Sequence, residues 1–410
     1  MPETPPPGAE PLDPVPAPRV LLAGGGTAGH VNPLLATAAA LRDPALGGRE
    51  ETGILVLGTA EGLEAGLVPE AGFDMAVVPR VPMPRRPTGD LFMLPRRLSR
   101  AVGAAGEAIE AVGAQVVVGF GGYVSTPAYL AARRAGVPVV IHEQNARPGL
   151  ANRLGASWAA AVALTFASTP LRSSKGRTEV TGLPLRPAIG ELVARLAEPD
   201  GAAAARRSGA AALGLDPRAP TVLITGGSLG AQRLNEVLAA ALPSLSPDLQ
   251  VLHLTGRDKD GPVRAAVEAA VAAGADPGLA ERYHVLDYLV AMEQAYACAD
   301  GVICRSGAGT VAELTALGLP ALYVPLPIGN GEQRLNAADV VAAGGGRLVA
   351  DARLTAADVV DFTALLTRPA ERGAMAAAAA STGVRDGARR LADLIRTVAR
   401  EGSPSPRRKA

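Results

Sequence analysis

Gly-Val-Ile-Cys-Arg-Ser-Gly-Ala-Gly-Thr-Val-Ala-Glu, residues 301–313, joins an apolar run, a turn of small residues and the start of a helix. The run at Val302 predicts a short buried parallel strand, and the helical spacing from Thr310 stops at Gly318. Small residues before a helix leave its first N–H groups accessible, which favours a phosphate. Glu313 lies about one turn into that helix, where its carboxylate would accept hydrogen bonds from ribose hydroxyls. The alternative is an ordinary strand-to-helix turn with a surface glutamate.

The second half of the chain repeats the first, and this repeat decides the fold. Three pairs of segments correspond: residues 20–29 with 222–230, 116–122 with 302–309, and 136–140 with 318–322. Each half therefore predicts a Rossmann-like domain with glycine-rich turns at its strand ends, and the two domains would face each other across a cleft. This α/β arrangement fits a nucleotide-bearing ligand in the second domain and its reaction partner in the first.

The composition agrees with two domains and excludes several functions. A chain of 410 residues with 48% hydrophobic content can bury two sizeable cores. A net charge of +1 argues against nucleic acid as the main partner. Cys298 and Cys304 fit no metal-site spacing and predict core thiols in a reducing compartment. No signal peptide opens the chain and residues 156–167 are too short for a membrane span, so we expect a cytoplasmic protein that could still bind a membrane surface.

The expected boundaries follow shifts in composition along the chain. Residues 1–18 predict a disordered proline-rich leader, 19–188 the first domain, 189–220 a helix with a flexible linker, 221–382 the second domain, 383–400 an amphipathic closing helix and 401–410 a frayed basic tail.

Gly24, Gly26 and Gly29 fit the dinucleotide fingerprint G-x-G-x-x-G. However, the next predicted strand ends in Gly58-Thr59, where a dinucleotide-binding protein would carry an acidic residue for the ribose. The sequence therefore disfavours an NAD(P) enzyme, and we expect no cofactor.

Residues 79–100 predict an unusual loop in which arginines are interleaved with apolar side chains. Such a mixture suits anionic lipid, because apolar groups insert and guanidinium groups meet the headgroups. A core-packing helix with a solvated basic face is the alternative. The residues expected at the membrane are Val81, Arg85, Arg86, Phe92, Leu94, Arg96 and Arg97.

If the ligand is a sugar nucleotide, departure of its diphosphate develops negative charge that must be neutralised. Residues 258–260, Asp-Lys-Asp, match the acidic string of metal-dependent transferases, but their charged surroundings predict a solvated loop. We therefore expect no metal site. The metal-free route would use the turn at Ser306, with Ser228 and the cation of Arg186.

The reaction also needs a base that deprotonates the attacking hydroxyl group. His30 follows the first glycine loop and is the preferred candidate, with Glu143 as the alternative. Glu143 belongs to His-Glu-Gln-Asn, residues 142–145, at the carboxyl end of a predicted strand, where parallel sheets bind their ligands. A plain polar loop fits the same residues. The histidines at positions 142, 253 and 284 are better explained as structural.

Six motifs occur together and in order along the chain. They are Gly-Gly-Thr-Ala-Gly-His at 25–30, Gly-Phe-Gly-Gly-Tyr-Val-Ser at 119–125, His-Glu-Gln-Asn at 142–145, Gly-Gly-Ser-Leu-Gly-Ala at 226–231, Arg-Ser-Gly-Ala-Gly-Thr-Val-Ala-Glu at 305–313 and Glu-Gln-Arg-Leu-Asn at 332–336. From about residue 19 to 400 the chain thereby resembles the MurG family within glycosyltransferase family 28. Members of this family are peripheral membrane N-acetylglucosaminyltransferases of peptidoglycan synthesis.

The resemblance implies a GT-B fold and an inverting transfer without a metal. GlcNAc would pass from UDP-GlcNAc to the 4-hydroxyl of MurNAc-pentapeptide in undecaprenyl-pyrophosphoryl lipid I, giving lipid II for the cell wall. It also implies a peripheral location on the cytoplasmic face of the cell membrane, with an anionic membrane surface as a partner.

Site residues follow from the same motifs. The resemblance places Thr27, Ala28 and Gly29 beside the sugar and diphosphate of UDP-GlcNAc, Asn145 at GlcNAc, Arg186 and Ser228 on the phosphate side, Leu289 at the uracil, Ala308, Gly309 and Thr310 at the diphosphate with Val311 and Ala312 in the same site, Glu313 at the ribose and Gln333 at the sugar hydroxyls. His30 matches the proposed base of the family. Ala28 replaces a frequent Gly, Leu229 a frequent Gln, and Glu332 a frequent Gln beside the retained Gln333.

Two other functions remain open on these residues. One is a different UDP-sugar transferase or epimerase with the same fold, and the loop at residues 79–100 favours a lipid acceptor over it. The other is a nucleotide-sugar-binding regulator without catalysis, which the presence of His30, Glu143 and Gln333 disfavours.

Overall fold

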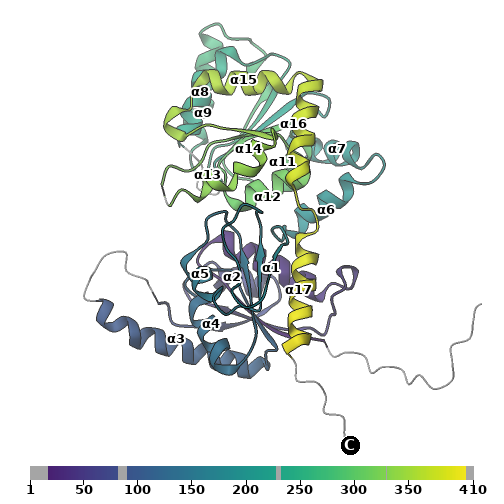
Figure 1. The fold of residues 1–410 in the computed structure, drawn as a ribbon. Helices are drawn as coiled ribbons and strands as arrows, with labels where there is room; N and C mark the ends of the chain where they lie inside the picture. The colour runs from purple at the N-terminus through teal and green to yellow at the C-terminus, as the bar shows by residue number, and fades with distance from the viewer. Residues whose placement is uncertain (1–16, 82–89, 228–231, 329, 403–410) are drawn as a thin grey trace, which may run out of the picture.

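The computed structural model describes residues 17–81, 90–227, 232–328 and 330–402, and only the backbone of residues 90–93. Two parallel sheets form, one in each half of the chain, and Figure 1 shows the two domains one above the other. This confirms the predicted pair of Rossmann-like domains.

The first sheet has the strand order β3-β2-β1-β4-β5-β6-β7, and every neighbouring pair is parallel. Its strands are β1 (Arg19–Ala23), β2 (Gly53–Gly58), β3 (Asp74–Val77), β4 (Val116–Gly119), β5 (Val139–Glu143), β6 (Ala161–Leu164) and β7 (Arg177–Val180). Its helices are α1 (Ala28–Arg42), α2 (Glu64–Glu70), α3 (Asp90–Val112), α4 (Ser125–Ala135), α5 (Leu150–Gly155) and, from the end of the chain, α17 (Gly387–Gly402), with a short 3₁₀ turn η1 (Pro44–Leu46).

The second sheet has the order β10-β9-β8-β11-β12-β13, again all parallel. Its strands are β8 (Thr221–Thr225), β9 (Gln250–Leu254), β10 (Tyr283–Leu286), β11 (Gly301–Cys304), β12 (Ala321–Tyr323) and β13 (Gly346–Leu348). Its helices are α8 (Gln232–Ala241), α9 (Asp260–Ala272), α10 (Leu279–Arg282), α11 (Met292–Cys298), α12 (Ala308–Leu317), α13 (Glu332–Asn336), α14 (Ala338–Ala342), α15 (Ala356–Leu366) and α16 (Pro369–Thr382), with the 3₁₀ turns η2 (Leu242–Ser244) and η3 (Asp351–Arg353).

The two sheets repeat one topology, as the sequence repeat predicts. Replacing β1 to β6 by β8 to β13 converts the first strand order into the second, and β7 is an added edge strand. In both sheets successive residues of a central strand enter different cores: Leu21 packs on one face of β1 and Leu22 on the other. Burial on both faces explains why these strands are continuous apolar runs.

The segment between the domains is more ordered than its composition indicates. Residues 189–220 predict one helix and a flexible linker, whereas the structure has two helices, α6 (Pro187–Leu196) and α7 (Gly201–Leu213). Both pack in the core of the second domain, through side chains such as Ile189, Leu192 and Ala205. Ala205 and Ala210 of α7 are buried in this packing, whereas the other alanines of the helix are exposed.

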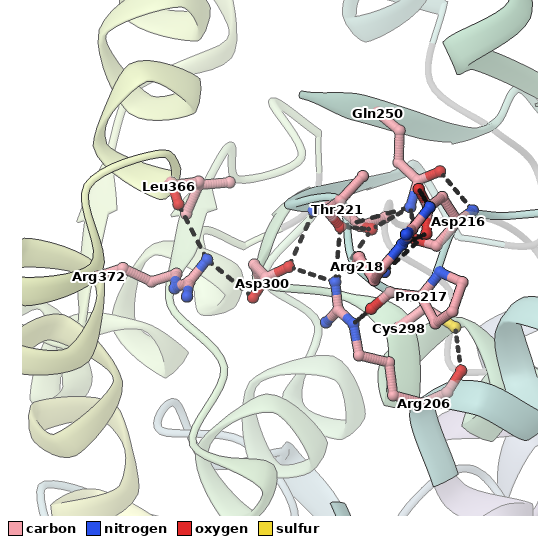
Figure 2. A network of polar contacts seen from close by, with 11 residues as sticks. Arg206, Asp216, Pro217, Arg218, Thr221, Gln250, Cys298, Asp300, Leu366 and Arg372 are labelled. Atoms are coloured by element: carbon pink, nitrogen blue, oxygen red, sulfur yellow. Dashed lines mark hydrogen bonds and ion pairs between the residues drawn. The ribbon is translucent and has the colours of Figure 1, made fainter. Parts of the chain in front are cut away.

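A polar network fixes α7 to the second sheet, at the strand ends opposite the glycine turns. Figure 2 shows Arg206 of α7 and Arg372 of α16 approaching the carboxylate of Asp300 from opposite sides, at 2.8 Å and 3.0 Å. The backbone N–H of Thr221 donates to the same carboxylate at 2.9 Å. Asp300 thus links two helices and the amino ends of β8 and β11.

Residues 90–100 form the first part of α3, so the prediction of a loop across residues 79–100 is wrong there. Apolar residues recur at helical spacing along α3 and pack in a hydrophobic core of the first domain. They are Leu98, Val102, Ala105 and Ile109. This packing holds the helix although Pro95 lies inside it. The alternative of a core-packing helix therefore holds for the body of α3.

The last described helix packs on the first domain. Helix α17 returns to the first sheet, where Figure 1 shows it beside α1. Leu391, Leu394, Ile395 and Val398 are buried there, which confirms the predicted amphipathic face. The two domains also share a hydrophobic core. In it, Ala146 and Phe166 of the first domain pack together with side chains of α12 in the second domain.

Candidate active site

The glycine turns of the first domain surround a cavity of about 320 Å³ at the carboxyl ends of β1, β2 and β4. The lining includes both glycine-rich turns, the start of α1 and the residues around α2: Gly25, Gly26, Thr27, His30, Thr59, Glu61, Gly62, Glu64, Arg80, Gly122, Tyr123 and Val124. His30 is therefore the one histidine that lines this cavity.

His30 is held in the first turn of α1, which begins at Ala28. The side chain of Thr27 meets Nδ1 of His30 at 3.1 Å. Gly121 and Gly122, with φ of +92° and +80°, pass close to the ring, and a Cβ on Gly121 would lie 3.2 Å from Nε2. Only glycine combines this backbone conformation with so close an approach.

The environment keeps the His30 imidazole neutral at neutral pH. Burial lowers its pKa below 6.5, and this effect outweighs the carbonyl of Gly25 and the charge of Glu64, which both favour the protonated ring. The tautomer protonated at Nδ1 donates to the Thr27 hydroxyl and leaves Nε2 able to accept a proton.

Glu143 ends β5 and is buried, with 2% exposure. Its carboxylate accepts hydrogen bonds from the N–H groups of Asn145 and Gly149, both at 3.0 Å, and from Nδ2 of Asn152 at 2.9 Å. Burial raises its pKa and outweighs these bonds. Glu143 thus orders the loop that carries Asn145.

Asn145 lies where the two domains touch. Nδ2 of Asn336, on α13, donates to Oδ1 of Asn145 at 3.2 Å and to the carbonyl of Ser306 at 3.3 Å. Oδ1 of Asn336 accepts from the N–H of Ala146 at 2.8 Å. One buried amide therefore joins the loop after β5 to the turn after β11.

The turn after β11 leads into α12, which begins at Ala308, two residues before the Thr310 from which the sequence predicts helical spacing. Gly307 is the N-cap of α12, and Ala308, Gly309 and Thr310 supply the first helical N–H groups, which have no partner within the helix. Ser306 is fully buried, and its hydroxyl has no hydrogen-bond partner among the described residues. The site thus has unused hydrogen-bonding groups at the positive end of a helix dipole.

Arg186 and Glu313 are brought together directly. Arg186 Nε and Nη2 donate to the two carboxylate oxygens of Glu313 at 2.8 Å and 3.0 Å, and the hydroxyl of Tyr296 donates at 3.1 Å. Burial lowers the pKa of Arg186, but the hydrogen bond and charge of Glu313 prevail and raise it. The predicted phosphate and ribose contacts are therefore each other's partners in this structure.

The remaining predicted residues fall into distinct places. Thr27, Ala28 and Gly29 are exposed at the start of α1, Leu289 is half-buried beside the second core, and Gln333 accepts the N–H of Leu326 at 2.9 Å. Val311 and Ala312 are buried in the core, where a ligand would meet only their backbone. Ser228 lies outside the described residues.

The predicted membrane residues are similarly divided. Val81 is buried at 6% exposure, Leu94 and Arg97 are half-buried, and Arg96 is exposed. Arg85, Arg86 and the side chain of Phe92 lie outside the described part of the chain. Within that part, no helix combines the length and apolarity needed to span a bilayer.

The sequence did not single out Glu64, Tyr296 or the contacts of Asn336. Asn336 lies in a quoted motif, but its partners are far away in the chain. Glu64 lies shortly after β2, and its carboxylate accepts the N–H of Gly26 in the first glycine loop. In the rejected Asp-Lys-Asp string, Asp258 and Lys259 are exposed, whereas Asp260 begins α9 and pairs with Arg264 at 3.0 Å, so the predicted solvated loop ends at Lys259.

Comparisons with known proteins converge on one family. The glycosyltransferase family 28 N-terminal domain matches residues 20–164, and the glycosyltransferase family 28 C-terminal domain matches residues 221–391. A protein of Clavibacter michiganensis subsp. michiganensis, named UDP-N-acetylglucosamine–N-acetylmuramyl-(pentapeptide) pyrophosphoryl-undecaprenol N-acetylglucosamine transferase, is 50% identical over 392 residues, which are 95% of this chain and 99% of that protein. A Bifidobacterium longum protein of the same name is 51% identical over 346 residues, 82% of this chain and 86% of its own length.

Solved structures agree. The crystal structure of Acinetobacter baumannii MurG has a TM-score of 0.71 and 28% identity, covering 93% of this chain and 99% of that one. UDP-GlcNAc 2-epimerase from Neisseria meningitidis, with a TM-score of 0.64, 15% identity and coverage of 93% and 100%, shares the fold alone.

Proposed function

Because this chain belongs to glycosyltransferase family 28, we propose that it transfers GlcNAc from UDP-GlcNAc to the 4-hydroxyl of MurNAc in undecaprenyl-pyrophosphoryl-MurNAc-pentapeptide (lipid I), giving lipid II. The observation that carries this proposal is the 50% identity, over 95% of the chain, to a relative named for that transfer. The reaction inverts the anomeric carbon and serves peptidoglycan synthesis.

UDP-GlcNAc binds to the second domain in this proposal. The N–H groups of Ala308 to Thr310 and the dipole of α12 hold the diphosphate, which gains negative charge as the sugar leaves. Arg186 adds a cation on the same side, and Glu313 accepts the ribose hydroxyls. Asn145 and Gln333 contact GlcNAc, Leu289 contacts the uracil, and Ser228 and residues 27–29 complete the site.

His30 is the general base, and Nε2 takes the proton of the attacking hydroxyl. The hydroxyl oxygen forms a bond to C1 of GlcNAc while the bond from C1 to the diphosphate oxygen breaks, so UDP leaves with the electron pair. A neutral imidazole is ready to accept the proton, and burial provides it. The carboxylate of Glu143 is a weaker candidate because three hydrogen bonds hold it within its own loop.

The start of α3 is the proposed contact with an anionic membrane surface at the cytoplasmic face of the cell membrane. Arg96 and Arg100 are exposed there, and Leu94 is half-buried. Cations beside apolar side chains favour anionic headgroups. The core contacts of α3 from Leu98 onward provide a fixed base for this surface.

Release of UDP from UDP-GlcNAc, measured with and without a lipid I analogue in the presence of EDTA, tests the proposal. We expect release that requires the analogue and continues in EDTA, together with a disaccharide product. Release without the acceptor, or an epimerised sugar, would instead identify a hydrolase or an epimerase on the same fold.

A further inference from the structure

A buried carboxylate lies directly behind the first glycine loop. Glu64, the first residue of α2, is fully buried. One of its oxygens accepts the N–H of Gly26 at 2.8 Å, and the other accepts the N–H and the hydroxyl of Thr59 at 2.9 Å and 2.7 Å. Burial raises the pKa of Glu64, but these hydrogen bonds prevail and lower it, so the group is charged at neutral pH.

Three glycines make room for this carboxylate. A Cβ on Gly25 would lie 2.3 Å from Oε1 of Glu64, one on Gly62 would lie 2.1 Å from Oε2, and one on Gly58 would lie 2.6 Å from Cγ. Real Cβ atoms do not approach so closely. The loop after β1, the end of β2 and the turn before α2 therefore enclose Glu64 and would not accept larger residues.

The glycine loop connects Glu64 to His30. The N–H of Gly26 donates to the carboxylate, while the carbonyl of the neighbouring Gly25 stabilises the protonated form of His30. The charge of Glu64 favours that form as well, and both side chains line the same cavity. Because Gly26 N–H is already occupied, this loop does not offer it to a phosphate.

We infer that Glu64 is a positioning residue for His30, whose carboxylate sets the shape of the first glycine loop and places a fixed negative charge behind the imidazole. The inference deepens the proposed transfer and rests on it. During the reaction the imidazole becomes positively charged, so a fixed anion behind it stabilises the state that follows proton transfer.

Other charged groups near His30 are few among the described residues that line the cavity. They are Glu61, which is exposed, and Arg80, whose guanidinium lies 5.7 Å from the ring centroid of Tyr123. The glycine loop before α1 and the turn after β4 contribute no charged side chain to the lining of the cavity. Among the residues that line the cavity, Glu64 is thus the buried charge, and it favours the protonated imidazole.

Nuclear magnetic resonance titration of the full-length protein with labelled histidines tests the inference without an activity assay. The chain has 4 histidines, so the His30 signal can be assigned by its loss in His30→Gln. In Glu64→Gln the pKa of His30 should fall, because the imidazolium loses its neighbouring anion. The matched control is Glu70→Gln, an exposed residue of the same helix, in which the pKa of His30 should stay at its wild-type value.

Kinetics provide the second readout. Glu64→Gln should lower kcat by roughly 10–100-fold, with little change in KM for UDP-GlcNAc, and should move the acid limb of the pH profile to lower pH. If Glu64→Gln does not fold, Glu64→Asp can replace it. This variant retains the charge but withdraws it from Gly26, so it should lower the pKa of His30 by less than the removal of the charge would. An unchanged pKa of His30 in the folded variants would overturn the inference. A wild-type protein that makes no lipid II would overturn the proposed transfer instead, and the titration separates these two results.

Discussion

Arg186 and Glu313 form a bidentate ion pair, with Nε–Oε1 and Nη2–Oε2 distances of 2.8 Å and 3.0 Å. Glu313 is 7% exposed and also accepts a hydrogen bond from Tyr296, so its carboxylate is fixed before any ligand arrives. Both residues are proposed to contact UDP-GlcNAc. Binding of the nucleotide therefore has to share or replace this pair, which links the segment before α6 to the first turns of α12.

Glu313→Gln should weaken binding of UDP by about 10–100-fold, because a charge-assisted hydrogen bond to the ribose is lost. Isothermal titration with UDP measures this, and kcat at saturating UDP-GlcNAc should change much less. Glu268→Gln, an exposed position on α9 of the same domain, is the matched control. Unchanged affinity for UDP would remove Glu313 from the ribose.

His30→Ala should reduce kcat by roughly 10²–10⁴-fold while the affinity for UDP-GlcNAc stays near its wild-type value. The reason is that the base acts on the acceptor hydroxyl and makes no contact that holds the nucleotide. His284→Ala, at a half-buried histidine of the second domain, is the control. Wild-type turnover in His30→Ala would assign the proton transfer to another group.

The pH dependence of the transfer should follow the neutral form of His30. Burial lowers the pKa of His30 below 6.5, and a base must be unprotonated, so kcat/KM should rise with pH through a value under 6.5 and then level off. A profile of kcat/KM in the wild-type protein tests this. An acid limb centred well above pH 6.5 would contradict the role of a buried neutral imidazole.

Acid should destabilise the fold through two other histidines. Burial lowers the pKa of His142 to about 4 and that of His253 to about 3. Their neutral forms favour the native state at pH values above about 6.5, and this stability is lost as the pH falls from there towards the folded-state values. For His142 the loss by pH 4 is on the order of 3 kcal/mol. Urea unfolding at pH 7 and pH 4.5 measures it, and His142→Gln should show a smaller difference between the two.

Arg96→Ser should weaken binding to vesicles that contain anionic lipid by about fivefold, since one cation near such a surface contributes about 1 kcal/mol. Transfer to a soluble acceptor analogue should be unaffected. Arg134→Ser, at an exposed arginine on α4, removes the same charge from another surface and should bind as the wild type does. Equal losses in the two variants would indicate a general charge effect without a membrane-facing surface.

The fold was predictable because both halves of the chain show the same local sequence patterns. Continuous apolar runs before glycine turns occur in both halves, and strands that are buried on both faces require such runs. The register of α3 was harder to predict, because several prolines and arginines near residue 90 conceal the spacing of Leu98, Val102, Ala105 and Ile109. Packing against the first domain stabilises this helix. The residues that carry its helical spacing are too few to stand out from the prolines and arginines around them.

Within the site, the sequence located the turns but could not pair distant side chains. The motif that ends in Asn336 and the one that ends in Asn145 are adjacent only after both domains have folded. The bond between Arg186 and Glu313 likewise joins residues from different segments. Glu64 lies outside every motif, and its role becomes visible only through the glycines that enclose it.

A structure of the complex that shows the position of UDP-GlcNAc is the sharpest test of the proposed site. We expect the diphosphate against the N–H groups of Ala308 to Thr310, the ribose hydroxyls at Glu313, and C1 of GlcNAc turned towards His30. A diphosphate bound instead at the loop of Gly25 and Gly26, where Glu64 already occupies the N–H of Gly26, would contradict it.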